Sequence, residues 1–236
     1  MQGLPRELPR EEAVSSRPGA KTVRTPLWDW PVRVIHWSFA ALIPALWWTA
    51  ENGEMGWHTS IGTVLMQLLV IRVLWGFVGS STARFSGFVR GPGAVLEHLQ
   101  SGAHEPTAGH NPAGGWSVLA MLGLMALQVL LGLFSGDPDD GTTGPLNHLV
   151  SSSTASRMTD LHGIVFYLIL VMIVLHLGAI LYYRVIKREN LIAPMLTGSR
   201  AMPAGTTGMV KAPVWRLIAC VVAAWLVGWI VWVGAA

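Results

Sequence analysis

The chain has 236 residues, of which 52% are hydrophobic and only 12% are charged. Soluble proteins carry about 25% charged residues, so this composition indicates a protein whose solvent is largely lipid. It excludes an intrinsically disordered chain and, despite the net charge of +3, a nucleic-acid-binding module. Cys220 is the only cysteine, which excludes an internal disulfide, a cysteine-rich zinc site and a cysteine-ligated iron–sulfur cluster.

Residues 1–27 contain five basic residues and four prolines without an apolar stretch, so we expect a flexible tail there. Beyond it, five stretches are apolar and long enough to cross a hydrocarbon core of about 30 Å, which takes roughly 20 helical residues. The predicted spans are residues 32–50, 57–78, 116–135, 161–183 and 214–234.

Lysine and arginine are distributed unevenly over the segments outside these spans. Thirteen lie in three segments that share one side of the membrane, namely the N-terminal segment up to Arg33 and residues 79–115 and 184–213. The segments on the opposite side, residues 51–56 and 136–160, contain only Arg157. By the positive-inside rule, the N-terminus is cytoplasmic and the C-terminus is periplasmic. In the inner loop, residues 94–99 (AVLEHL) predict a short interfacial helix, and we expect the outer loop at 136–160 to be irregular.

Four of the eight histidines lie within or at the edge of the predicted spans. An ionisable side chain inside a bilayer is costly and usually functional. His36 and His176 fall in the inner halves of their spans, whereas His58 and His162 begin their spans at the outer face. Depth alone therefore sorts them into an inner pair and an outer pair.

His162 and His176 are separated by fourteen residues on the fourth predicted helix. At 100° per residue, fourteen steps end about 40° short of four full turns, so both imidazoles face nearly the same way, roughly 21 Å apart. One helix thus offers an imidazole to each of two stacked sites, and spans one and two supply the opposing His36 and His58. Paired imidazoles from facing helices are typical of a six-coordinate haem iron.

Two other interpretations of the histidines stay open at this point. A lone intramembrane histidine often hydrogen-bonds a carbonyl or a hydroxyl instead of a metal, although four at matched depths are hard to obtain by chance. Zinc or copper transport would need carboxylates or thiolates beside the imidazoles. The interiors of the histidine-bearing spans contain neither.

Basic residues near the inner face are further candidates. Arg72 is a possible contact for a propionate of the inner haem, or else extends to lipid phosphate. Arg33, Arg184 and Lys187 are also possible propionate contacts, but the positive-inside pattern explains their positions equally well. The inner loop contains three more histidines that we expect to be solvent-exposed, namely His98, His104 and His110.

Several stretches of the chain resemble one known family. They are WDWPVRVIHW, GWHTSIG, WGFVGSSTARFSGFVRGPGAV, HNPAGGWSVLA, DLHGIVFYLILVMIVLH and YYRVIKRENL. Together they resemble the prokaryotic cytochrome b561 family, in the branch that overlaps the b-type cytochrome subunits of nickel–iron hydrogenases. The likeness extends from about Trp28 to about Leu196.

The resemblance implies an all-α integral membrane protein with a four-helix bundle at residues 28–196 that holds two non-covalent b haems. A cytoplasmic linker at 197–213 and one additional C-terminal transmembrane helix at 214–234 would follow. As the iron ligands, the resemblance implies His36 with His176 for the inner haem and His58 with His162 for the outer haem.

The family's role implies a di-haem cytochrome that carries electrons across the bacterial inner membrane, between the quinone pool and a periplasmic redox partner in a respiratory chain. It would act as a simple carrier or as a quinone-linked oxidoreductase. The first alternative is the membrane anchor cytochrome b subunit of a nickel–iron hydrogenase. The second is a non-haem membrane transporter or structural protein that uses the histidine cluster.

Overall fold

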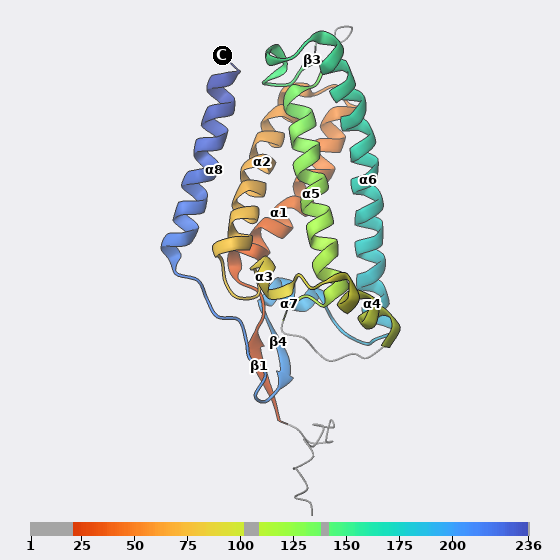
Figure 1. The fold of residues 1–236 in the computed structure, drawn as a ribbon, viewed down its shortest axis with the longest axis vertical. Helices are drawn as coiled ribbons and strands as arrows, with labels where there is room; N and C mark the ends of the chain where they lie inside the picture. Colours follow the sequence, from red (N-terminus) through yellow and green to blue (C-terminus); the bar gives the residue numbers. More distant parts are fainter. Residues whose placement is uncertain (1–20, 102–108, 138–141, 236) are drawn as a thin grey trace, which may run out of the picture.

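The computed structural model describes residues 21–101, 109–137 and 142–235, and long helices standing side by side dominate it (Figure 1). We term the end near β1 and β4 the lower end and the end near β3 the upper end, as drawn in Figure 1. The long helices are α1 (Trp30–Glu51), α2 (Met55–Val78), α5 (Pro112–Phe134), α6 (Ser152–Val185) and α8 (Val214–Gly234).

Polar side chains define where three of the long helices begin. The Asp29 carboxylate accepts a hydrogen bond from the backbone N–H of Val32 at the start of α1. Asn111 caps α5 through Gly114, and Ser151 caps α6 in the same manner. A proline in the first turn of both α1 and α5 suits the helix because the N–H it lacks would have no intrahelical acceptor.

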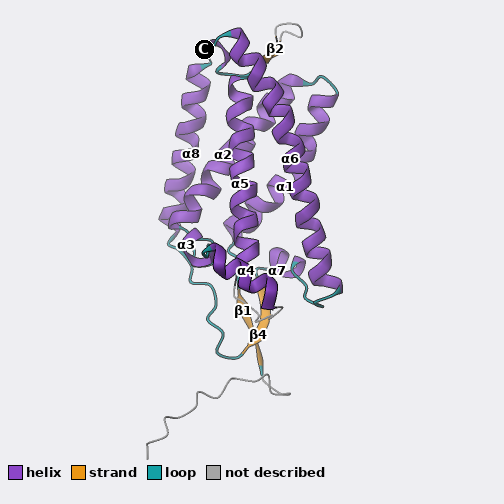
Figure 2. Ribbon diagram, turned by 45° about the vertical axis from the view of Figure 1, so that its right-hand side comes forward, coloured by secondary structure: helices purple, strands orange, loops and turns teal. Residues whose placement is uncertain are grey.

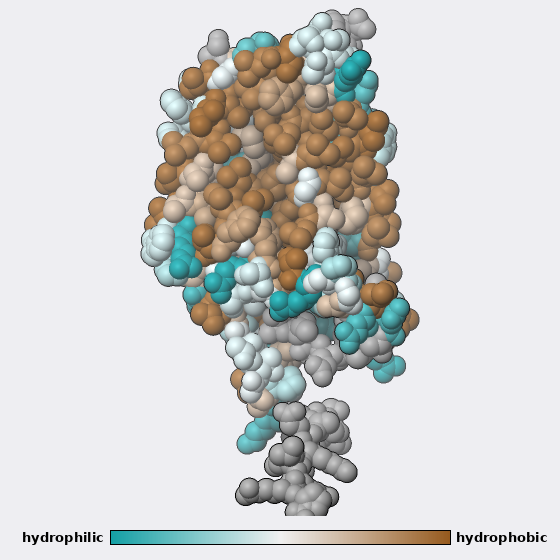
Figure 3. All heavy atoms as spheres, viewed as in Figure 1, coloured by the Kyte–Doolittle hydropathy of each residue, from teal (hydrophilic) through white to brown (hydrophobic). Residues whose placement is uncertain are grey.

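Apolar side chains cover the middle of the bundle, and polar residues gather towards its two ends (Figure 3). Four helices of the described chain, α2, α5, α6 and α8, are long and apolar enough to cross a membrane. Large apolar side chains on them are solvent-exposed, for example Leu175 on α6 at 61% and Ile230 on α8 at 62%. Such a surface is stable only when it contacts lipid or another protein.

The first predicted span, 32–50, corresponds to α1 but differs in character from the others. The helix forms in the bundle and packs on α2, yet it is not among the four helices that meet the length and hydropathy criterion. Its sequence explains this, because an arginine, a histidine, two prolines and four tryptophans dilute its apolar residues. The other predicted spans correspond to α2, α5, α6 and α8.

The lower end contains a two-stranded sheet where the sequence predicted a flexible tail and a linker. The antiparallel partners are β1 (Thr22–Pro26) and β4 (Ser199–Pro203), with Thr22 opposite Pro203. Residues 1–20 of the predicted tail lie outside the described residues. The predicted interfacial helix is present as α4 (Pro92–Ser101), and two further short helices are α3 (Phe85–Phe88) and α7 (Ile192–Thr197).

The upper end is more regular than the irregular loop predicted at 136–160. It contains β2 (Gly136–Asp137), β3 (Thr142–Thr143) and the short 3-10 helix at Asn147–Leu149, and Figure 2 shows this region above the helices. α6 begins at Ser152, nine residues before the predicted span. Hydropathy marks only the apolar part of that helix, whereas its polar first turns follow from the Ser151 cap.

The main hydrophobic core lies between α1, α2, α5 and α6. Its buried members are Ile35, Phe39, Leu65, Leu69, Leu122, Met125, Leu131, Val165 and Ile169. A second, smaller cluster joins α8 to α2 at the lower end and contains Val32, Trp75, Ala83 and Cys220. The four-helix core is therefore complete without α8, which packs on α2 from outside.

Candidate functional site

The upper histidine pair consists of His58, in the first turn of α2, and His162 on α6. Their ring centres are 6.2 Å apart, with the ring planes at 71°. The His58 Nδ1 atom lies 3.0 Å from the carbonyl oxygen of Leu46, and the His162 Nδ1 atom lies 3.0 Å from that of Gln128. A carbonyl only accepts, so each Nδ1 carries the proton and each Nε2 keeps its lone pair. This is the tautomer that binds a metal through Nε2.

The lower pair consists of His36 on α1 and His176 on α6. Their ring centres are 6.3 Å apart, with the ring planes at 55°. The His36 Nδ1 atom is buried and has no hydrogen-bond partner among the described residues. Trp37 lies edge-on to the His36 ring at 5.1 Å and donates to the carbonyl of Met195 at 3.3 Å. The four histidines thus form the two pairs that depth along the sequence predicted.

Both ring separations suit one metal ion between two imidazoles. A metal–nitrogen bond of about 2 Å and about 1.2 Å from the nitrogen to the ring centre, counted on both sides, give about 6.4 Å. No group of three or more His, Cys, Asp or Glu that could hold a metal occurs in the part of the chain that the structure describes. The donor set therefore suits a metal whose other ligands come from a cofactor, as in a haem.

Small residues border the upper pair. Gly62 lies one turn below His58 on the same face of α2, where an added Cβ would meet only the Leu46 side chain at 3.9 Å. Gly132 of α5 lies against the His162 ring, because a Cβ there would be 2.9 Å from Cε1 and 3.2 Å from Nδ1. Gly62 leaves space beside the ring of His58, whereas Gly132 allows α5 to approach His162 closely.

An apolar layer separates the two pairs along α6. Val165 and Ile169 follow His162 by three and seven residues, so they lie on the same face as both histidines. They pack with Phe39 of α1 and with Leu65 and Leu69 of α2. This layer excludes water from the space between the pairs.

Arg72 of α2 is the one predicted site residue that is not a histidine, and it is only 6% exposed. Its guanidinium lies 5.6 Å from the centre of the Phe85 ring, and its Nη1 atom has no hydrogen-bond partner among the described residues. Asp29 is close enough to act on its charge. That carboxylate already accepts hydrogen bonds from Trp75, Ser80 and the backbone N–H of Val32.

His110 corrects a prediction, because it is packed into the lower end instead of being exposed to solvent. Its ring lies between those of Trp28 and Phe88, with both centre-to-centre distances at 4.6 Å. Burial lowers its pKa to about 3, and the nearby charges of Arg72 and His176 act in the same direction. The polar sequence around His110 concealed this, because the two rings that pack against it belong to residues that are distant in the sequence. The side chain of His98 and the whole of His104 lie outside the described residues.

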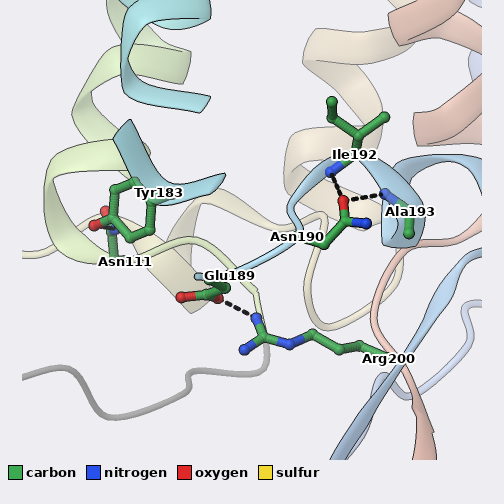
Figure 4. A network of polar contacts seen from close by, with 7 residues as sticks. All are labelled: Asn111, Tyr183, Glu189, Asn190, Ile192, Ala193 and Arg200. Atoms are coloured by element: carbon green, nitrogen blue, oxygen red, sulfur yellow. Dashed lines mark hydrogen bonds and ion pairs between the residues drawn. The ribbon is translucent and has the colours of Figure 1, made fainter. Parts of the chain in front are cut away.

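Polar contacts fix the segments around this lower end. Asn111, next to His110, donates to the Tyr183 hydroxyl on α6 at 2.7 Å (Figure 4). Arg200 of β4 pairs with Glu189, in the segment after α6. Arg33 donates to the carbonyl of Leu196, so it joins α1 to α7. The Nε atom of Arg33 is buried and has no hydrogen-bond partner among the described residues.

Comparison with known proteins gives one match. A protein-family model described as prokaryotic cytochrome b561 matches residues 27–198, which is well over half of the chain. The match includes all four paired histidines, Arg72 and His110, and it ends before α8. No curated protein and no solved structure matches the chain.

Proposed function

Because the chain belongs to the prokaryotic cytochrome b561 family and is a b-type cytochrome of membrane electron transfer, we propose that it holds two haems and carries electrons across the membrane. The observation that carries the proposal is the geometry of the two histidine pairs. Each pair joins α6 to α1 or α2 at a ring separation that suits one metal, and α6 presents both of its imidazoles on one face.

In this proposal His36 and His176 would hold the iron of one haem, and His58 and His162 would hold that of the other. Bound haem would supply one-electron redox chemistry at iron. An iron held by two imidazoles would have no position left for oxygen, which suits electron transfer. The carbonyls of Leu46 and Gln128 orient the upper imidazoles and make them stronger ligands.

The residues between the pairs set the conditions for transfer. The layer around Phe39, Val165 and Ile169 keeps both sites dry, and α6 fixes their spacing at roughly 21 Å along its axis. At the lower pair, Arg72 brings a buried positive charge, and we propose that it contacts a haem propionate. A nearby cation favours the reduced, less positive state of a haem.

The charge pattern supports an orientation with the lower end in the cytoplasm. Thirteen lysines and arginines lie in the segments that join at the lower end, against Arg157 alone at the upper end. In this orientation α1 is a fifth membrane-crossing helix of the bacterial inner membrane. The His58–His162 haem then faces a periplasmic redox partner, and electrons exchange with the quinone pool of a respiratory chain.

A nickel–iron hydrogenase anchor would use the same residues and the same chemistry in a fixed complex. Its distinguishing feature is the partner, so co-purification of the tagged protein from its native membrane separates the two functions. Hydrogenase subunits that stay bound through purification favour the anchor. A protein that purifies alone and is reduced by a quinol favours the independent carrier.

A reduced-minus-oxidised spectrum of the detergent-purified protein, with a pyridine haemochrome count, tests the central proposal. We expect a split or broad α band of b type and about two haems per chain, one for each histidine pair. A protein that shows no haem absorbance after expression with ample haem would contradict the electron-transfer function. The histidines would then suit a transporter or a proton path.

A further inference from the structure

His110 is a half-buried histidine that the two histidine pairs leave without a role. Its Nδ1 atom is inaccessible and has no hydrogen-bond partner among the described residues. The rings of Trp28 and Phe88 hold it at 4.6 Å on either side. Because its pKa is lowered to about 3, the imidazole is neutral at physiological pH and can still donate one hydrogen bond. A buried polar atom that has no hydrogen-bond partner destabilises the folded state.

Arg72 lies nearby and also has a buried polar atom without a hydrogen-bond partner. It acts electrostatically on His110, and its buried Nη1 atom also lacks a partner in the described part of the chain. Its nearest anion, Asp29, already accepts from Trp75, Ser80 and Val32. A buried cation whose donors are not all satisfied is stabilised by a further anion.

The position of both residues relates them to the lower histidine pair. His176 is close enough to His110 to affect its ionisation. Asn111 donates to Tyr183, which lies two turns below His176 on the same face of α6. His110 also immediately precedes the N-terminus of α5, and that end of a helix favours negative charge.

We propose that His110, through Nδ1–H, and Arg72 together bind the propionate carboxylate of the lower haem. The inference rests on the proposed function, because it requires a haem between His36 and His176. The two propionates are the anionic groups of a b haem, and the other groups on its ring edge are apolar. The carboxylate satisfies both buried donors, and Trp28 and Phe88 restrict the imidazole to an orientation in which it can donate.

The test replaces His110 in the full-length protein with both haems bound. His110→Phe keeps an aromatic ring between Trp28 and Phe88 but removes the donor, whereas His110→Asn keeps an N–H donor of similar reach. His148→Phe, at an exposed position of the upper end, is the matched control. Optical redox titration gives the midpoint potential of each haem. Infrared redox-difference spectra of haem with ¹³C-labelled propionates report on the carboxylate itself.

We expect His110→Phe to lower the midpoint potential of the lower haem alone and to shift its propionate bands. A tenfold change in the ratio of oxidised to reduced haem corresponds to 59 mV for a one-electron couple, and we expect a shift of about this size or smaller. His110→Asn should restore most of the shift, and His148→Phe should leave both haems unchanged. Loss of the lower haem in His110→Phe with retention in His110→Asn also supports the proposal.

Three outcomes would overturn it. One is a His110→Phe protein with both haems, an unchanged lower potential and unchanged propionate bands. Another is a His110→Asn protein that behaves like His110→Phe, because that would indicate a packing role. The third is a wild-type protein without haem, which overturns the proposed function as well, whereas the first two leave that function intact.

Discussion

The upper and lower histidine pairs have nearly equal ring separations, 6.2 Å and 6.3 Å, but they differ in what surrounds them. At the upper pair, carbonyls of Leu46 and Gln128 accept from the Nδ1 atoms of both histidines. At the lower pair, the His36 Nδ1 atom has no partner in the described chain. Backbone carbonyls therefore orient both imidazoles of the upper pair.

The lower pair has charge nearby instead of ordered acceptors. Arg72 is buried close to it and the half-buried His110 lies nearby, whereas no buried lysine or arginine accompanies the upper pair in the described residues. Two sites with the same ligand type can thus be tuned by different means, one by backbone dipoles and the other by a buried cation and a neutral donor. The two histidine pairs are therefore alike in chemistry and spacing, and only their surroundings distinguish them.

Removal of a ligand is the largest test of this comparison. We expect His176→Ala to lose the lower haem and keep the upper one, and His162→Ala to do the reverse, because each change removes one of the two imidazoles that form its pair. Optical and electron paramagnetic resonance spectra of each variant would assign the two haems. If either change removed both haems from a folded protein, the pairing would be wrong.

Displacement of an upper ligand without its removal is the next test. In Gly132→Ala, the new Cβ would lie 2.9 Å from Cε1 of His162, so the ring must turn away from the Gln128 carbonyl. Loss of a hydrogen bond that orients a metal-binding histidine usually lowers metal affinity or activity by about 10–100-fold. Haem titration of the haem-depleted protein measures this loss, which should be confined to the upper site.

Gly123→Ala is the control for that variant. It lies on the same helix, and an added Cβ there meets nothing within 4 Å. Equal loss of haem from both alanine variants would mean that helix propensity or membrane insertion causes the effect, and not contact with His162.

The sequence predicted the helices and the histidine pairs because both follow from local periodicity. Hydropathy found the apolar part of each long helix, and the fourteen-residue spacing of His162 and His176 determines their shared face. The family match over residues 27–198 supports the prediction of a b-type haem. Predicted spans and observed helices differ most where polar residues extend a helix, as in α6.

The lower end was predicted less well because its structure depends on contacts between distant segments. The pairing of β1 with β4 joins residues more than 170 positions apart, and no local pattern indicates it. The polar sequence around His110 predicted exposure to solvent, whereas contacts with the rings of Trp28 and Phe88 cover much of its side chain. The sequence offered one signal that His110 is ordered. It directly precedes Asn111, which caps the start of α5.

Arg72→Gln tests whether charge near the lower pair affects only that site. Two unit charges about 10 Å apart, at an effective dielectric constant of about 20, interact with an energy of about 1–2 kcal/mol. The reduced haem loses this stabilisation, so we expect its midpoint potential to fall while that of the upper haem stays unchanged. Arg216→Gln is the control, because Arg216 also lies at the lower end but binds the Val78 carbonyl and stacks on Trp215. Equal shifts in the midpoint potentials of both haems would contradict the assignment of Arg72 to the lower haem.

The smallest effect on the haems is expected from changes in α8, which packs on α2 and contains no histidine. Buried small residues, Cys220, Ala224 and Gly228, recur at every fourth position of α8, so the two backbones approach closely. Ala224→Leu would force the helices apart, and overpacking of this kind costs about 1–3 kcal/mol. Val222→Leu, at a side chain that is 50% exposed, should cost little. We expect a lower unfolding temperature in detergent for Ala224→Leu, with both haem spectra unchanged. A spectral change at one level would show that α8 supports that haem, and the two levels would then differ in their helices as well as in their charges.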